Sequence, residues 1–192
     1  MVGSADDVEE LRMQGQPADD NRPRGLHFLV ELVNTVQQDA TATAQELQGV
    51  VDRHGGPDLG LTEATGRELR EAIAPLARIL DTDDTDRAAE AINALLDRHP
   101  SRPRLVRLPE RPWALHSQTP PGADPAHWLL STCALALALW LSERGHCAWG
   151  RCAAPGCDRH FIDTGRKSPQ RYCSTRCGTR VRVAAHRAQR RS

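Results

Sequence analysis

Four cysteines near the C-terminus constrain the fold of this chain more than any other feature. They form two close pairs: Cys152 and Cys157 are separated by four residues, and Cys173 and Cys177 by three. Two thiolates on one tight turn face the same point, and two such pairs supply the four sulfurs of a tetrahedral structural Zn²⁺ site. The spacing therefore predicts that the end of the chain folds around a zinc ion.

The residues next to each pair support this interpretation. The step Pro155-Gly156 supplies a tight turn inside the first pair. Ser174 can cap a helix that runs to about Gln189, and Cys177 then lies in its first turn, where the positive end of the helix stabilises a thiolate. A turn, a hairpin and a helix start form a treble-clef-like finger. So small a module depends on its metal for much of its folding free energy.

Two other interpretations of the cysteines stay open at this point. Four cysteines can also hold an iron–sulfur cluster, or they can be free or disulfide-forming thiols. Residues 1–21 are acidic and lack the basic start and apolar core of a secretory signal, so we expect a reducing cytoplasm, which favours metal binding. We expect Cys133 to be a packed core residue and Cys147 to be a spare thiol beside a site that four ligands already close.

The formal charge of the chain is zero but unevenly divided. Residues 151–192 carry eleven Lys and Arg against two acids, a net charge of +9, so the remainder carries −9. An acidic body with a basic end is expected when one end meets a polyanion. The most apolar run, residues 128–141, is too short to span a bilayer, and we expect no membrane contact.

Apolar residues recur at helical spacing through most of the chain before the cysteines. The pattern predicts a mobile segment over residues 1–22, a helical body over 23–146 and the zinc finger over 147–192. The predicted helices cover residues 25–37, 43–54, 62–80 with a kink or break at Pro75, 83–99 and 124–141. Residues 104–108 and 113–116 read as a short hairpin. The fold class is thus mainly α (α+β): a helical body with a small hairpin, then a treble-clef-like four-cysteine finger that ends in a basic helix.

The cysteine segment also resembles a known family. The motifs that carry the resemblance are Arg151-Cys-Ala-Ala-Pro-Gly-Cys157, Phe161-Ile-Asp-Thr164, Arg171-Tyr-Cys-Ser174 and Cys177-Gly-Thr-Arg180. They are similar to the CGNR-type zinc finger of bacterial proteins over about residues 149–190. That finger usually follows an ABATE domain of stress-induced transcription regulators. Residues 24–145 resemble this domain in layout, with Phe28-Leu-Val-Glu-Leu-Val-Asn-Thr35 similar to its opening helix. The resemblance implies DNA binding and transcriptional control.

The chain departs from the family pattern at two points. Thr179 stands where the family has asparagine, and the second cysteine pair has three intervening residues in place of the commoner four. The shorter spacing still suits two ligands at the start of a helix.

The predicted last helix carries arginines and no acid. Arginine's planar fork suits both phosphates and guanine edges, and at helical spacing Arg176, Arg180 and Arg187 fall on one side. Alternatively, the guanidinium of Arg180 hydrogen-bonds across the finger. We expect His160 to be a loop residue and His186 a phosphate-facing residue. The candidate nucleic-acid contacts are Arg176, Arg180, Arg182, Arg187, Arg190 and Arg191.

These patterns favour a DNA-binding transcriptional regulator with structural Zn²⁺. One finger is a small DNA reader, so we expect a homodimer, with the body serving dimerisation or the sensing of a small-molecule effector. A zinc-dependent protein- or RNA-interaction module is the alternative. We expect no enzyme activity, because nucleophile triads, Gly-rich phosphate loops and His-Glu metal motifs are missing from the sequence. The candidate ligand-pocket residues are His27, Asn34, Trp113, His116, Trp128 and Trp140.

Overall fold

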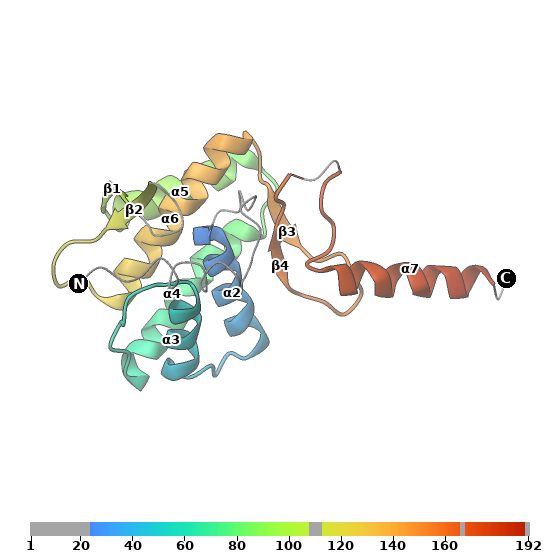
Figure 1. Cartoon of the computed structure of the whole chain (residues 1–192), viewed down its shortest axis with the longest axis horizontal. Coiled ribbons are helices and arrows are strands. Elements are labelled where there is room, and N and C mark those ends of the chain that lie inside the picture. The colour runs from blue at the N-terminus through green and yellow to red at the C-terminus, as the bar shows by residue number, and fades with distance from the viewer. Residues whose placement is uncertain (1–23, 108–112, 166–167, 191–192) are drawn as a thin grey trace, which may run out of the picture.

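The structure is a computed structural model that describes residues 24–107, 113–165 and 168–190. The expectations for residues 1–22, Arg191 and the end of the first hairpin strand at Leu108 lie outside these residues. The described helices and the first hairpin follow the order predicted from the sequence, whereas the strands of the finger lie on either side of the first cysteine turn and do not follow it (Figure 1). The described elements are α2 (Arg24–Gln38), α3 (Ala44–Arg53), α4 (Glu63–Leu80), α5 (Thr85–Arg98), β1 (Arg102–Val106), β2 (Ala114–Gln118), α6 (Pro125–Arg144), β3 (Trp149–Arg151), β4 (His160–Ile162) and α7 (Thr175–Gln189).

The helices begin where side chains can accept their first backbone N–H groups. Thr43 and Glu46 form a reciprocal capping box at α3, and Thr62 caps α4. Asp84 caps α5, and Asp124 caps α6 just before a first-turn proline. These local signals explain why the predicted helix starts agree with the structure.

The helix α6 lies at the centre of the helical body and packs against α2, α4 and α5. It is apolar on nearly all sides, as expected for a helix surrounded by others. In the described part of the chain, α6 is the one helix long and apolar enough to cross a bilayer. Its packing accounts for this composition, because the buried side chains belong to the common core: Leu129, Leu130, Cys133, Ala134, Leu137 and Trp140.

The helix α4 runs without interruption from Glu63 to Leu80, so of the two outcomes expected at Pro75 the break does not occur and the kink stays a prediction. A proline inside a helix removes one backbone hydrogen bond. Apolar residues on both sides of Pro75 are buried in the core and anchor both parts of α4 to the body. These residues are Leu69, Ile73, Leu76, Ile79 and Leu80.

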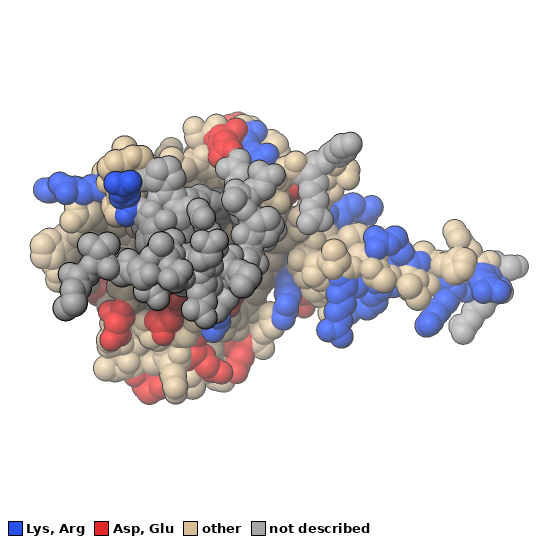
Figure 2. All heavy atoms as spheres, in the orientation of Figure 1, with Lys and Arg blue, Asp and Glu red and all other residues tan. Residues whose placement is uncertain are grey.

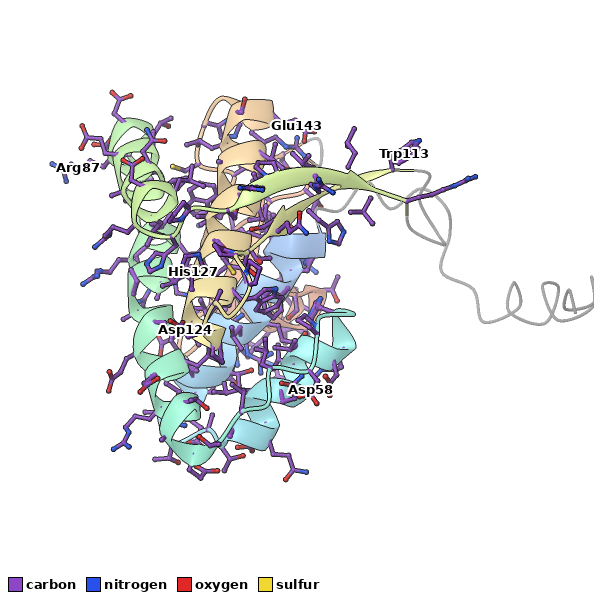
Figure 3. All side chains as sticks on the ribbon, turned by 90° about the vertical axis from the view of Figure 1, so that its left-hand side faces the viewer. Asp58, Arg87, Trp113, Asp124, His127 and Glu143 are labelled. Carbon is purple, nitrogen blue, oxygen red and sulfur yellow. The ribbon has the colours of Figure 1, made fainter. Side chains whose placement is uncertain are left out.

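The strands β1 and β2 form an antiparallel hairpin whose bounds lie one or two residues from the predicted ones, with Arg104 opposite His116 and Leu105 opposite Leu115. The hairpin meets α6 near its base, where the Ser117 hydroxyl donates to Ser131 at 3.3 Å. Figure 3 shows its outer end, marked by Trp113, extending beyond the helices. The hairpin is therefore a projection from the body and not a layer of its core.

The chain passes from α6 into the cysteine segment through Gly145, which adopts the left-handed conformation (φ 69°) that ends a helix. The strands β3 and β4 then pair antiparallel and pack against α2 and α4. Ser174 caps α7, as predicted, and Figure 1 shows α7 projecting away from the body. In the finger, β3 and β4 thus pack on the helical body, whereas α7 extends into solvent.

Candidate metal centre and basic helix

The four cysteine sulfurs Cys152, Cys157, Cys173 and Cys177 lie within 4.8 Å of one another. The sulfurs of Cys157, Cys173 and Cys177 are separated by 3.7, 3.7 and 3.8 Å. A Zn–S bond of about 2.3 Å gives a tetrahedron with edges of about 3.8 Å. A disulfide would bring two sulfurs to about 2.05 Å, and a multinuclear iron–sulfur cluster spreads its thiolates further apart because each iron binds its own ligands. The geometry suits a structural zinc ion.

Short local contacts build this arrangement from the two turns. The N–H of Cys157 donates to the carbonyl of Ala154 at 3.0 Å and closes the first turn. The N–H of Cys173 donates to the sulfur of Cys152 at 3.3 Å, which ties the two pairs together. Charge-assisted donors of this kind stabilise thiolates. The described Cys133 and Cys147 lie outside the four-sulfur group, as expected.

The thiols of Cys173 and Cys177 differ in how readily they lose a proton. Burial raises the pKa of the Cys173 thiol to about 12. The hydroxyl of Ser174 lowers the pKa of the Cys177 thiol to about 7. A bound cation replaces the protons of all four sulfurs, so metal binding releases protons and weakens in acid.

Arg180 is held against the cysteine turn. Its Nη2 donates to the carbonyl oxygen of Pro155 at 3.2 Å and lies 4.0 Å from the sulfur of Cys177. A guanidinium in this position joins α7 to the first turn and offsets part of the negative charge of the thiolates. This contact corresponds to the second of the two roles considered for Arg180, a hydrogen bond across the finger.

The finger is fixed to α2 by one asparagine side chain. The Nδ2 of Asn34 donates to the carbonyl of His160 at 3.1 Å, and its Oδ1 accepts the N–H of His160 at 2.8 Å. The two residues are 126 positions apart in the chain, and His160 is 1% exposed. Asn34 therefore satisfies both backbone groups of a buried strand residue, as a neighbouring strand would.

A second polar contact joins the finger to the end of α4. The carboxylate of Asp81 accepts from Arg151 through both oxygens (2.5 and 3.0 Å) and from the Nε2 of His160 at 2.7 Å. The hydrogen bond from Arg151 lowers the pKa of the Asp81 carboxyl. The indole N–H of Trp149 donates to the carbonyls of Ile79 and Thr82 at 3.0 and 3.2 Å. The finger and body are thus joined by directional hydrogen bonds on two helices.

Both parts of the chain match models of known protein families. Residues 26–144 match ABATE (Putative stress-induced transcription regulator), and residues 149–190 match zf-CGNR (CGNR zinc finger). The chain belongs to the ABATE family. The order of the two matches confirms the resemblance seen in the sequence. A search of curated proteins finds no match.

The exposed surface of the CGNR finger is dominated by the arginines of α7. Figure 2 shows Lys and Arg gathered over α7 and the base of the finger, whereas much of the acidic surface lies along the helical body. At about 100° per residue, Arg176, Arg180 and Arg187 fall within about 40° around the axis, with Val183 on the same side. Val183 is 43% exposed. Arg182 lies on another side and donates to Thr179 at 3.1 Å. The candidate contact Arg191 lies outside the described residues.

The expectation of one pocket lined by six residues of the ABATE domain does not hold. His27 and Asn34 line a cleft between α2 and the finger. Trp113 is 61% exposed at the end of the hairpin, and His116 lies exposed on β2 opposite Arg104. The structure therefore separates these four residues, because the hairpin points away from α2.

The two remaining candidates of that set are packed in the body. The ring of Trp128 lies against Phe28 with ring centroids 5.8 Å apart. Trp140 is 3% exposed, and its indole N–H donates to the carbonyl of Ala148 at 3.2 Å. Both residues have partners that account for their positions in the core.

The geometry of the finger does not bring together the parts of a nuclease-like site. His160 directs Nε2 to Asp81 on the body. Asp163 accepts the backbone N–H groups of Gly165 and Gln170, which is a turn-stabilising role. His186 lies on the exposed outer half of α7. The acid and the two histidines thus face different surroundings.

Sequence reasoning missed the residues that join the ABATE domain to the finger. Asp81 follows the last turn of α4 and reads locally as an ordinary helix cap, and Arg151 reads as part of the basic segment. Asn34 was noticed in the resemblance to the opening helix of the family, but its partner is 126 residues away. Asn34 is a polar amide on the inner side of an otherwise apolar helix. This is the one local signal in the sequence that could have indicated its contact with the finger.

Proposed function

We propose that the protein is a zinc-dependent, DNA-binding transcriptional regulator, with α7 as the element that contacts DNA. The observation that carries the proposal is the position of α7. The helix starts at the zinc site, projects from the body and carries arginines but no acid. Family membership supports a regulatory role that involves nucleic acid.

The length and sparse packing of α7 also indicate that this helix has a binding partner. A 15-residue helix is about 22 Å long, and an isolated helix of this length is marginal in water. In α7, Gly178 is the buried residue of the described helix, and a Cβ built on it would lie 3.2 Å from the ring of Tyr172. Packing therefore holds the first turns, and the outer half gains a partner when it enters a groove. The major groove of B-DNA, about 12 Å wide, admits one helix.

The arginines of α7 divide into two roles in this proposal. Arg180 holds the cysteine turn through Pro155 and contributes positive charge near the DNA. Arg176 and Arg187 contact phosphates or base edges, and Arg182 and Arg190 contact neighbouring phosphates. Arg191 would extend this set at the C-terminal end.

The remaining parts of the proposal concern the whole protein. We place it in the cytoplasm as a homodimer, because one finger buries too little surface to select a DNA site alone. Its ABATE domain (residues 23–146) supplies the dimer contact or senses a small molecule, and the finger (147–192) reads DNA. The protein does not act as an enzyme in this proposal.

The test is selection of bound DNA from a random pool, with zinc-loaded full-length protein at physiological salt. An enriched motif with two symmetric half-sites supports a dimeric regulator. About six neutralised phosphates predict an affinity loss of about 10³-fold between roughly 50 and 200 mM salt. Replacing Arg176 and Arg187 with alanine should weaken binding and lower the logarithmic salt slope by about 2.

The matched control replaces two exposed arginines of the body, Arg67 and Arg98, on α4 and α5. This variant loses the same charge and should bind DNA as the wild type does. Equal weakening by both variants would show that net charge alone drives binding. No enrichment and no retention of DNA would favour the protein- or RNA-interaction module.

A further inference from the structure

A cleft of about 510 Å³ lies between α2 of the ABATE domain and the finger. Small-molecule sites commonly enclose 300–1,000 Å³ and lie between structural units. Glu31 and Asn34 line it from α2, His54 lines it from the end of α3, and Arg159 and Phe161 line it from the finger. A molecule in this cleft would contact both units at once.

The one carboxylate among the residues that line the cleft is already engaged. Glu31 accepts Nε and Nη2 of Arg53 at 2.9 and 2.7 Å through one oxygen, and lies 2.7 Å from the Nε2 of His54 through the other. Burial opposes ionisation of Glu31, but the hydrogen bonds from His54 and Arg53 outweigh it and lower the pKa of the carboxyl. A cationic ligand would therefore have to compete with Arg53 for this charge.

The cationic group on the opposite wall is exposed and engaged with a neutral partner. Nη2 of Arg159 donates to the side-chain oxygen of Gln38 at 2.9 Å. A neutral amide leaves the positive charge of the guanidinium uncompensated by this contact, and a planar guanidinium can hold a carboxylate or phosphate through two parallel hydrogen bonds. The wall of the finger thus favours an oxyanion.

Three apolar side chains also line the cleft. Val30, Phe161 and Ile162 line it and are each largely buried, at 9%, 7% and 4% exposure. An apolar body of a ligand can lie on these side chains while its anionic group meets Arg159. A bare inorganic anion would leave this part of the cleft unused.

The same cleft reaches the base of α7. Cys173, a ligand of the metal site, and Ser174, the cap of α7, both line it. The N-terminal end of α7 therefore lies beside the cleft, next to one of the four metal-binding cysteines. An occupant would touch the residues that set the direction in which α7 leaves the finger.

We propose that this cleft binds a small organic anion, a carboxylate or phosphate on an apolar body, and that its occupancy changes the DNA affinity of α7. The anionic group pairs with Arg159, and the apolar body lies on Phe161 and its neighbours. The second half of the proposal rests on the proposed function, because it needs a DNA-binding helix. The first half concerns ligand binding alone and is measurable without DNA.

The binding experiment uses the zinc-loaded full-length protein and two probes, benzoate and inorganic phosphate, followed by amide and side-chain NMR shifts. Benzoate should shift the side-chain signals of Asn34 and Gln170, and phosphate should bind more weakly because it lacks an apolar body. Arg159→Ala should weaken benzoate binding by about 10-fold or more. The side chain of Arg159 is exposed, so this variant keeps the fold.

Arg171→Ala is the matched control, since Arg171 is an exposed arginine of the finger whose guanidinium lies 6.0 Å from the ring of Tyr172. It should bind benzoate as the wild type does. Absence of benzoate binding, or equal binding by Arg159→Ala, overturns the site. Equal affinity for phosphate and benzoate overturns the apolar half of the assignment.

The second experiment measures affinity for the selected DNA with and without saturating benzoate. The wild type should change by about fivefold or more and Arg159→Ala should not respond. If the protein binds benzoate but retains no DNA, the ligand site stands and the proposed function is refuted. Benzoate binding without any effect on DNA affinity overturns the regulatory half of the inference.

Discussion

Replacing Asn34 with alanine tests whether the finger is held on the helical body by the two hydrogen bonds described above. The change removes the donor to the carbonyl of His160 and the acceptor of its N–H, at 3.1 and 2.8 Å. His160 is 1% exposed, so only water that enters from the adjoining cleft, which Asn34 lines, could replace the lost amide. A buried backbone group left without its partner costs about 1–3 kcal/mol, and two such groups give an expected loss of about 2–6 kcal/mol. That is a large part of the 5–15 kcal/mol by which domains are typically stable.

The assay is guanidinium unfolding of the zinc-loaded protein, followed by tryptophan fluorescence. Trp149 reports on the contact directly, because its indole N–H bonds to the end of α4. Thr35→Ala is the control: the Thr35 hydroxyl donates to the backbone carbonyl of Glu31 in its own helix at 2.9 Å, so its loss should cost about 0.5–1 kcal/mol. If both variants lose the same free energy of unfolding, Asn34 does not hold the finger and the reasoning fails.

Three further predictions concern the metal centre and its surroundings. Cys157→Ser should abolish stoichiometric zinc, measured by metal analysis, and lower the helical signal of α7 in far-ultraviolet circular dichroism; unchanged zinc content would contradict the four-sulfur site. Arg180→Ala should weaken both zinc retention against a chelator and DNA binding, because Arg180 bonds to Pro155, whereas Arg187→Ala should weaken DNA binding alone; identical profiles would refute the division of roles. Asp81→Asn should lower the free energy of unfolding by about 1–3 kcal/mol. The pKa of Asp81 is lowered in the folded state, so its contribution to stability is fully present above its ordinary pKa of about 3.9 and is lost as the pH falls through the lower, folded value. The difference in free energy of unfolding between wild type and Asp81→Asn should therefore stay constant between about pH 8 and 5.

The local parts of the fold were predictable because their causes lie within a few residues. Thr43, Asp84, Asp124 and Ser174 each cap the helix that follows, and the caps accept N–H groups two or three residues away. The cysteine pairs were predictable for the same reason, since each pair occupies one turn. Sequence periodicity also found the core face of α4, although the break that was one of the two outcomes expected at Pro75 does not occur.

The contacts between distant segments were not predictable in this way. Asp81 and Arg151 are 70 residues apart, and their separate sequence contexts give no indication of each other. The ligand-pocket set failed because residue type alone selected Trp113 and Trp140, one exposed on the hairpin and the other buried in the core. The cleft that the structure forms instead depends on how the finger packs on α2, which only the assembled fold determines.

The hydrogen bonds that hold the finger on the helical body have a consequence for the direction of α7. The helix α7 extends about 22 Å from its base, so a tilt of about 10° at the finger would move its tip by about 4 Å. Successive base pairs are about 3.4 Å apart, so that error would place Arg187 on the wrong step of a groove. The hydrogen bonds that Asn34 donates and Asp81 accepts are directional, unlike apolar contacts, and they resist such a rotation. The hydrogen bonds of Asn34 and Asp81 on the body therefore limit how far α7 can tilt, and so determine how accurately its arginines could stay aligned with successive base pairs of DNA.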